Sequence, residues 1–169
     1  GNARVVHNDY LSKREEYYKE TKKALTVSQY KKEYLPALKK EKEYLKDTDK
    51  FVYENACRNV DDAYNRFFKG LSGFPKYASR TKPNGNSFTT NFTNNNIELK
   101  MIGGTPYVKL PKIGNVRFIL PKGKKLNDIQ PHGVSIKAAT VNKEPDGSYR
   151  IALRMESVID KPVFSTVIN

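Results

Sequence analysis

Few side chains in this sequence have the types and the spacing that catalysis requires. The two histidines, His7 and His132, each lack Cys or His partners at the spacing of a metal site. Cys57 lacks a basic partner that would activate it and falls on the apolar side of a predicted helix, so we expect it to be buried. Asp61 and Asp62 are consecutive, and on a helix such side chains diverge by about 100 degrees, which prevents them from sharing a metal ion. We therefore expect a chain that is not an enzyme and that holds no cofactor.

A basic loop and a run of asparagines are better candidates, and both point to binding. The basic loop, residues 74–86, interleaves cations with an aromatic ring and a hydroxyl: Lys76, Tyr77, Ser79, Arg80 and Lys82. Such a set can hold a phosphate backbone, which positions a nucleic acid without specifying its sequence; a flexible polar linker is the alternative. The asparagine run, Thr93-Asn94-Asn95-Asn96, favours a turn, because Asn tolerates the left-handed conformation. Its amides could also contact adenine edges.

The charge favours a polyanionic partner. The 169 residues include 31 Lys and Arg against 18 Asp and Glu, a net charge of +13, and most of the excess follows residue 70. Such a field attracts nucleic acids through counterion release. An anionic membrane surface is the competing explanation, but no basic amphipathic helix, lipidation signal or apolar run of about 18 residues supports it. A single cysteine excludes a disulfide within the chain, which suits a reducing, cytoplasmic compartment.

One long helix is the clearest of the elements that must position these residues. Over residues 49–70, apolar side chains recur at steps of three and four, with Asp49 as the predicted N-cap and Gly70 as the stop. The opposite face predicts two ion pairs, Glu54–Arg58 and Asp62–Arg66. The predicted apolar stripe consists of Tyr53, Ala56, Cys57, Val60, Ala63, Tyr64, Phe67, Phe68 and Leu71.

Shorter helices are predicted before it and strands after it. We expect a first helix over residues 4–25, and a further helical segment capped by Ser28 and divided by Pro36 into 28–34 and 36–45. A period of two then predicts strands over residues 87–92, 97–102, 107–110, 116–120, 133–143 and 148–157. Their hairpin turns are Gly103-Gly104 and Pro145-Asp146-Gly147. On the last hairpin, Val134, Ile136 and Ala138 are expected in the core, and Ala139 on the polar face. Lys137, Arg150 and Arg154 are expected to face solvent or a ligand.

The predicted fold class is therefore α+β. A helical bundle occupies residues 1–73, the basic linker loop residues 74–86, and a small antiparallel β-barrel residues 87–169.

In combination, these segments resemble TnpB (OrfB) proteins, the RNA-guided nucleases of insertion sequences that are related to compact type V CRISPR effectors. The similar segments keep their order across almost all 169 residues. They are Ala3-Arg4-Val5-Val6-His7-Asn8, Leu25-Thr26-Val27-Ser28, Asp49-Lys50-Phe51, Ala63-Tyr64-Asn65-Arg66-Phe67-Phe68, Gly73-Phe74-Pro75-Lys76-Tyr77, Ser87-Phe88, Phe92-Thr93-Asn94-Asn95-Asn96 and Leu110-Pro111-Lys112-Ile113-Gly114-Asn115-Val116.

The resemblance implies a helix-turn-helix-like recognition lobe inserted into a wedge domain, which is an oligonucleotide-binding-like barrel. In the family these parts hold guide RNA and recognise a short duplex motif beside the target. It implies that Lys50, Glu54 and Thr93, together with the loop at Thr26 and Val27, contact that motif. Relatives often have Gln where this chain has Glu54. A carboxylate can accept from cytosine N4 but cannot pair bidentately with adenine, so we expect a different motif or no contact there.

Two departures from the family affect what is expected. The family's first barrel strand precedes Arg4, so the barrel is expected to have an open edge through which two chains could pair as a homodimer. The family's RuvC-like nuclease and four-Cys zinc ribbon would follow Asn169. The expected activity is therefore binding of double-stranded DNA and guide RNA without cleavage, at the nucleoid.

Two alternatives stay open. The chain could be a stand-alone, nuclease-free regulator that occupies DNA or RNA. It could also be a protein-interaction scaffold whose charge serves solubility.

Overall fold

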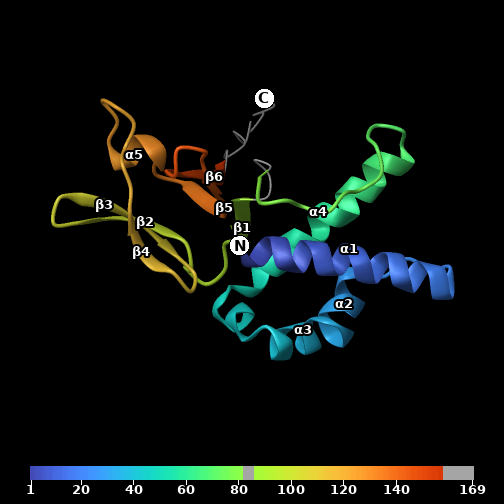
Figure 1. Cartoon of the computed structure of the whole chain (residues 1–169). Coiled ribbons are helices and arrows are strands. Elements are labelled where there is room, and N and C mark those ends of the chain that lie inside the picture. Colours follow the sequence, from blue (N-terminus) through green and yellow to red (C-terminus); the bar gives the residue numbers. More distant parts are fainter. Residues whose placement is uncertain (82–85, 158–169) are drawn as a thin grey trace, which may run out of the picture.

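Helices and sheets form two neighbouring parts of the molecule. The structure is a computed structural model, and it describes residues 1–81 and 86–157. Figure 1 shows helices α1 to α4 on one side, the strands on the other, and the N-terminus beside β1 between them. The helices are α1 (Asn2–Thr21), α2 (Val27–Glu33), α3 (Leu35–Glu41), the 3-10 helix η1 (Glu43–Asp47), α4 (Lys50–Phe68) and α5 (Leu126–Ile129). The strands are β1 (Ser87–Asn91), β2 (Glu98–Ile102), β3 (Thr105–Leu110), β4 (Gly114–Arg117), β5 (Val134–Lys143) and β6 (Tyr149–Ser157).

The predicted ends of α4 are confirmed. The Asp49 carboxylate caps the helix by accepting a hydrogen bond from the Phe51 backbone N–H at 3.3 Å. Gly70 adopts the left-handed conformation, with φ of 69°. The backbone N–H groups of Gly70 and Leu71 then donate to the carbonyls of Phe67 and Arg66, which is the Schellman arrangement that ends a helix.

The buried side of α4 is shorter than the predicted stripe. Phe68 and Leu71 are 73% and 66% exposed, so their assignment to the core was wrong. The reason is tertiary: the last turn of α4 meets Phe74, whose ring lies 5.4 Å from that of Phe67, and no larger apolar surface in the described part of the chain covers it. The buried residues of α4 are Val52, Tyr53, Ala56, Cys57, Val60 and Tyr64.

The short helices begin and end at slightly different residues than the pattern predicts. Helix α1 ends at Thr21 rather than at residue 25, because Lys22 turns into the left-handed region at φ 59°. The N-cap of α2 is Thr26 and not Ser28. The Thr26 hydroxyl accepts from the Gln29 backbone N–H, and the Gln29 side chain accepts from the Thr26 backbone N–H, which forms a capping box. The predicted division at Pro36 is confirmed, since Pro36 lies in the first turn of α3, but the segment predicted over residues 36–45 is interrupted at Lys42, between α3 and η1.

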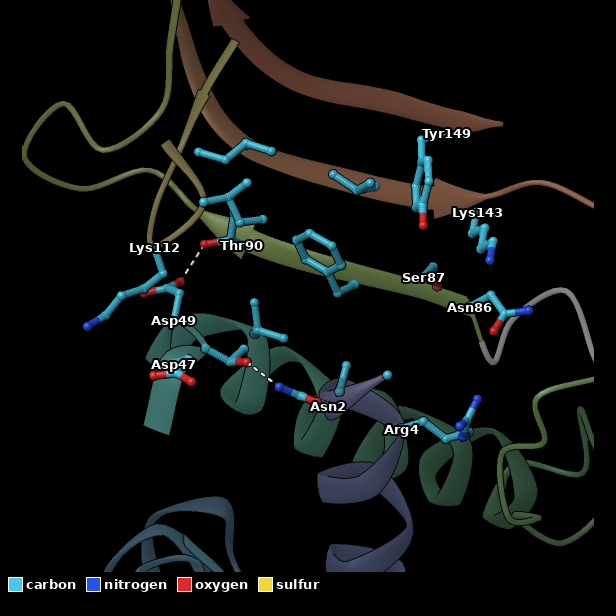
Figure 2. A pocket seen from close by; sticks show the side chains of 18 of the residues that line it. Asn2, Arg4, Asp47, Asp49, Asn86, Ser87, Thr90, Lys112, Lys143 and Tyr149 are labelled. Atoms are coloured by element: carbon cyan, nitrogen blue, oxygen red, sulfur yellow. Dashed lines mark hydrogen bonds between the residues drawn. The ribbon is translucent and has the colours of Figure 1, made fainter. Parts of the chain in front are cut away.

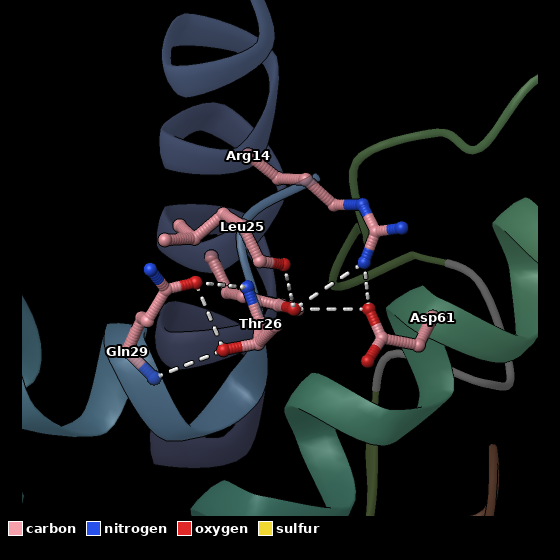
Figure 3. A network of polar contacts seen from close by, with 6 residues as sticks. Arg14, Leu25, Thr26, Gln29 and Asp61 are labelled. Carbon is pink, nitrogen blue, oxygen red and sulfur yellow. Dashed lines mark hydrogen bonds and ion pairs between the residues drawn. The ribbon is translucent and has the colours of Figure 1, made fainter. Parts of the chain in front are cut away.

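A polar network inside the helical part joins α1 to α4 (Figure 3). The Tyr10 hydroxyl donates its proton toward Asp61 Oδ1, at 2.9 Å, and the Leu25 carbonyl, at 3.0 Å. Arg14 binds the same Asp61 oxygen, and its guanidinium lies 4.5 Å from the centre of the Tyr64 ring. Burial raises the pKa of the Asp61 carboxyl, while the Tyr10 hydroxyl and the Arg14 guanidinium oppose that rise. The network therefore depends on one carboxylate that serves two donors, the buried Tyr10 hydroxyl and the partly buried Arg14 guanidinium.

The described strands form two antiparallel sheets of three strands each. Their orders are β1-β5-β6 and β2-β3-β4. The two predicted hairpins are confirmed, with Gly103, Gly104 and Gly147 at positive φ in the turns. Strand β4 begins earlier than predicted, at Gly114, and ends at Arg117.

The alternation on β5 is broken by a bulge. The register between β5 and β6 shifts between Ile136 and Ala138, so Lys137 has no opposite residue. Ala138 and Ala139 are consequently both buried, at 5% and 0% exposure. The assignment of Ala139 to the polar face was therefore wrong, whereas Ile136 is buried as predicted.

The two sheets share one apolar core but do not form a closed barrel within the described residues. Ile97, Val108 and Leu110 from one side pack with Ile136 and Ala139 from the other. No strand of β1-β5-β6 pairs with a strand of β2-β3-β4 among residues 86–157. The α+β class and the order of helices before antiparallel sheets are confirmed.

Candidate nucleic-acid interface

The N-terminus of α4 is fastened to β1, and this α4–β1 junction is formed by Asp49, Asn55, Thr89, Thr90 and Asn91. The Thr90 hydroxyl, which is buried, donates to the Asp49 carboxylate at 2.5 Å. The Asn55 amide donates to the Thr89 carbonyl at 3.1 Å and to the Asn91 side-chain oxygen at 3.2 Å. Asp49 thus serves two purposes, because the same carboxylate caps α4. The junction fixes the first turn of α4 against the strand that leads into the asparagine run.

The junction joins the two segments that carry the predicted contact residues Lys50 and Thr93. Lys50 follows Asp49 directly, is exposed, and has its ammonium 5.1 Å from the centre of the Phe51 ring. Thr93 lies three residues after Thr90, and its backbone N–H donates to the Asn96 side chain at 2.7 Å.

The asparagine run is a turn, as predicted, and it leaves two amides exposed. Asn94 and Asn95 have φ of 47° and 55°, the left-handed conformation. Asn96 closes the turn: its amide donates to the Asn91 carbonyl at 2.9 Å. The exposed Asn94 and Asn95 side chains make no hydrogen bond within the described part of the chain, so they are open to a ligand.

Glu54 is already engaged by two cations. Lys31 and Arg58 each bind one of its carboxylate oxygens at 2.8 Å, and these contacts lower the pKa of the carboxyl, that of Lys31 most. The predicted Glu54–Arg58 pair is thus confirmed, whereas Asp62 and Arg66, both within the described residues, form no ion pair. A Glu54 bound in this way presents less negative charge to an approaching phosphate.

The loop before α2 has a structural role that the resemblance to TnpB proteins did not imply. The Thr26 hydroxyl is used by the capping box with Gln29, and Val27 packs against the helical core. Thr26 is nevertheless exposed.

The basic loop is anchored to α1 by a side chain that sequence reasoning missed. The Asn8 amide donates to the Ala78 carbonyl at 3.1 Å, and its oxygen accepts from the Ala78 backbone N–H at 2.8 Å. This pair of bonds holds the loop between Tyr77, which is 53% exposed, and Ser79, whose hydroxyl lies 2.7 Å from that of Thr81. Lys76 and Arg80 are exposed, and Lys82 lies outside the described residues. The sequence did contain a signal for this contact. Asparagine is unfavourable inside a helix, so an asparagine at position 8, within α1, suggests that its side chain has a tertiary partner.

The cations of the last hairpin differ in their surroundings. Lys137 lies at the bulge, forms an ion pair with Glu156 at 3.1 Å, and its carbonyl accepts from the Phe92 N–H at the start of the asparagine turn. Arg150 lies 3.5 Å from Glu144. Arg154 is exposed and forms no ion pair with any described residue, so its charge is available to a phosphate.

A first cleft of about 750 Å³ runs between the helices and the sheets (Figure 2). The start of α1 and the N-terminus of α4 form one wall, and β1 with the β5–β6 hairpin forms the other. It collects cations from four separate segments, accompanied by three carboxylates. The cations are Arg4, Arg80, Lys112 and Lys143, and the carboxylates belong to Asp47, Asp49 and Glu144.

The structure gives less support to a metal site or to a reactive cysteine. Within residues 1–81 and 86–157, no three His, Cys, Asp or Glu side chains gather closely enough to hold a metal ion. Cys57 is buried as predicted, and burial raises the pKa of its thiol to about 12, which disfavours the reactive thiolate. None of the described helices is long and apolar enough to cross a lipid bilayer.

Comparison with known proteins gives no assignment, since neither a protein-family model nor a curated protein matches this sequence.

Proposed function

We propose that this chain is the nucleic-acid-binding part of a TnpB-like RNA-guided nuclease. In this proposal it holds guide RNA and recognises a short motif in duplex DNA beside the target. The observation that carries the proposal is the α4–β1 junction. It joins the segment that begins with Asp49 and Lys50 to the strand that leads into the turn containing Thr93, and the resemblance implies that Lys50 and Thr93 act together.

Two further observations support binding of a polyanion. The chain has a net charge of +13. Four exposed cations, Lys50, Lys76, Arg80 and Arg154, form no ion pair with a described carboxylate, so their charge is available to phosphates.

In this proposal, the α4–β1 junction recognises the DNA motif, and the basic loop holds the nucleic-acid backbone. Lys50, Thr93, Asn94 and Asn95 contact base edges in a groove, where amides and ammonium groups distinguish base pairs. The basic loop contacts the backbone. The two sheets correspond to the wedge domain, and their shared core to the inside of an oligonucleotide-binding-like barrel.

A binding selection over a randomised duplex library tests this division. We expect Lys50→Ala, or Thr93→Val, to relax discrimination at one position of the motif by about 1–3 kcal/mol, because a base contact is lost. We expect Arg80→Ala, or Lys76→Ala, to weaken binding to all sequences alike and to reduce the salt slope by about 1, because a phosphate contact is lost.

Lys46→Ala is the matched control, since Lys46 is an exposed lysine of η1 whose ammonium is paired with Glu43 at 3.0 Å. It should leave both the motif and the overall affinity unchanged. If Lys50→Ala and Arg80→Ala have the same effect across the library, the division between recognition and holding is wrong.

A further inference from the structure

A second cleft, of about 450 Å³, meets the first at Arg4. It lies where the start of α1, the middle of α4, the basic loop and β1 come together. Its polar lining combines cations, amides, hydroxyls and an aromatic ring. His7 comes from α1, Asn55 and Asn59 come from α4, Lys76 and Tyr77 come from the basic loop, and Thr89 comes from β1. Its volume is in the range of small-molecule sites, which accommodates one nucleotide and not a duplex.

The charge of the second cleft differs from that of the first. None of the described residues that line the second cleft is an Asp or a Glu, whereas Arg4 and Lys76 are both among them. The first cleft, by contrast, contains Asp47, Asp49 and Glu144. A small site whose described lining holds two cations and no carboxylate favours an anionic ligand.

Two side chains of the second cleft are available for contacts with such a ligand. Asn59 and Tyr77 are exposed, and neither makes a side-chain hydrogen bond within residues 1–81 and 86–157. Asn55, in contrast, is used by the junction, where its amide contacts three acceptors. An amide can pair with the edge of a base, and a tyrosine ring can stack on its face.

His7 lines the wall of the second cleft but does not add to its positive charge. It contacts the backbone of Ala56 and Lys76, and burial lowers the pKa of its imidazole, which keeps it neutral near pH 7. Arg4 and Lys76 are therefore the two charged cations among the described residues of the lining.

We propose that the second cleft binds one unpaired nucleotide of an RNA. Its phosphate lies between Arg4 and Lys76, and its base lies against Tyr77 and the Asn59 amide. Unpaired nucleotides in bulges and loops can leave the stack and expose the base edge and both faces, which a duplex does not offer. This inference rests on the proposed nucleic-acid binding and adds the structural class of RNA that this site selects.

The test uses the whole chain and two fluorescently labelled RNA duplexes that are identical except for one bulged adenosine. We expect the bulged duplex to bind about tenfold more tightly than the paired one in a fluorescence anisotropy titration. Tyr77→Ala and Asn59→Leu should each remove most of that preference, and Asn59→Leu, which lies outside the basic loop, should leave the affinity for the paired duplex within about twofold. Tyr18→Ala and Asn65→Leu are matched controls at exposed positions outside the cleft, and both should keep the preference.

Equal binding of the two duplexes by the unchanged protein would overturn the inference and leave the proposed function standing. A preference that persists in both Tyr77→Ala and Asn59→Leu would also overturn it. Binding to neither duplex, nor to duplex DNA, would overturn the proposed function as well.

Discussion

Replacing Asp61 with alanine is expected to lower the free energy of unfolding by about 3 kcal/mol. The substitution leaves the Arg14 guanidinium, whose side chain is 14% exposed, without its carboxylate. It also removes one of the two acceptors of the buried Tyr10 hydroxyl. Loss of one partner from a buried ion pair costs about 3–5 kcal/mol, and the 30% exposure of Asp61 places this case at the lower end. Urea unfolding followed by far-UV circular dichroism measures the change.

The neighbouring carboxylate provides the matched control. Asp62 is exposed on the same helix, and Asp62→Ala should change stability by no more than about 0.5 kcal/mol. The double variant Arg14→Met with Asp61→Leu should recover most of the loss, because replacing both partners by apolar groups leaves no buried charge unpaired. If Asp61→Ala is as stable as Asp62→Ala, the network does not hold α1 to α4.

Replacing Asp49 with alanine is expected to cost about 2–4 kcal/mol and to loosen the α4–β1 junction. Two losses add here. Removing an N-cap costs about 0.5–2 kcal/mol. Leaving the Thr90 hydroxyl, which is 1% exposed, without its acceptor costs about 1–3 kcal/mol more. Urea unfolding measures the sum, and hydrogen exchange at the backbone of β1 shows whether the strand opens locally.

Two conservative variants separate these losses. Asp49→Asn keeps an acceptor for both the Phe51 N–H and the Thr90 hydroxyl, so it should cost less than about 1 kcal/mol. Thr90→Val removes the donor but leaves the cap, and should cost about 1 kcal/mol. An Asp49→Ala loss no larger than that of Thr90→Val would mean that the carboxylate does not couple the helix to the strand.

The features that could be predicted from the sequence are those set by neighbouring residues. Asp49 and Gly70 mark the ends of α4 because the cap and the left-handed stop each depend on side chains within a few positions. The same is true of the turns at Gly103-Gly104 and Asn94-Asn95, where positive φ selects Gly and Asn. These local signals were sufficient to define the α+β class and the two hairpins.

The features that sequence reasoning missed depend on residues far apart in the chain. Phe68 fits the period of the α4 stripe but is exposed, because covering it would need another element that the period cannot indicate. The bulge at Lys137 shifts the register of β5 and buries Ala139, although the local pattern alternates regularly. The separation of the strands into two sheets is a property of their pairing, which strand lengths and turns do not determine.

The same distinction applies to the candidate site. The exposed cations and the asparagine turn are visible in the sequence, but their grouping is not. It depends on the contacts of Asp49 with Thr90 and of Asn8 with Ala78, which are separated by 41 and 70 positions. The Lys31 contact that neutralises part of the Glu54 charge spans 23 positions and was likewise not predicted.

A salt titration of duplex DNA binding tests the central claim most directly. If the exposed cations contact phosphates, the logarithm of the affinity should fall linearly with the logarithm of salt concentration between about 50 and 200 mM, with a slope of about −3 or steeper. Four phosphate contacts, by the unpaired cations Lys50, Lys76, Arg80 and Arg154, would give a slope of about −3.6 at about 0.9 per contact. A flat dependence on salt, or no detectable binding at the lowest salt concentration, would contradict nucleic-acid binding and favour the protein-interaction scaffold.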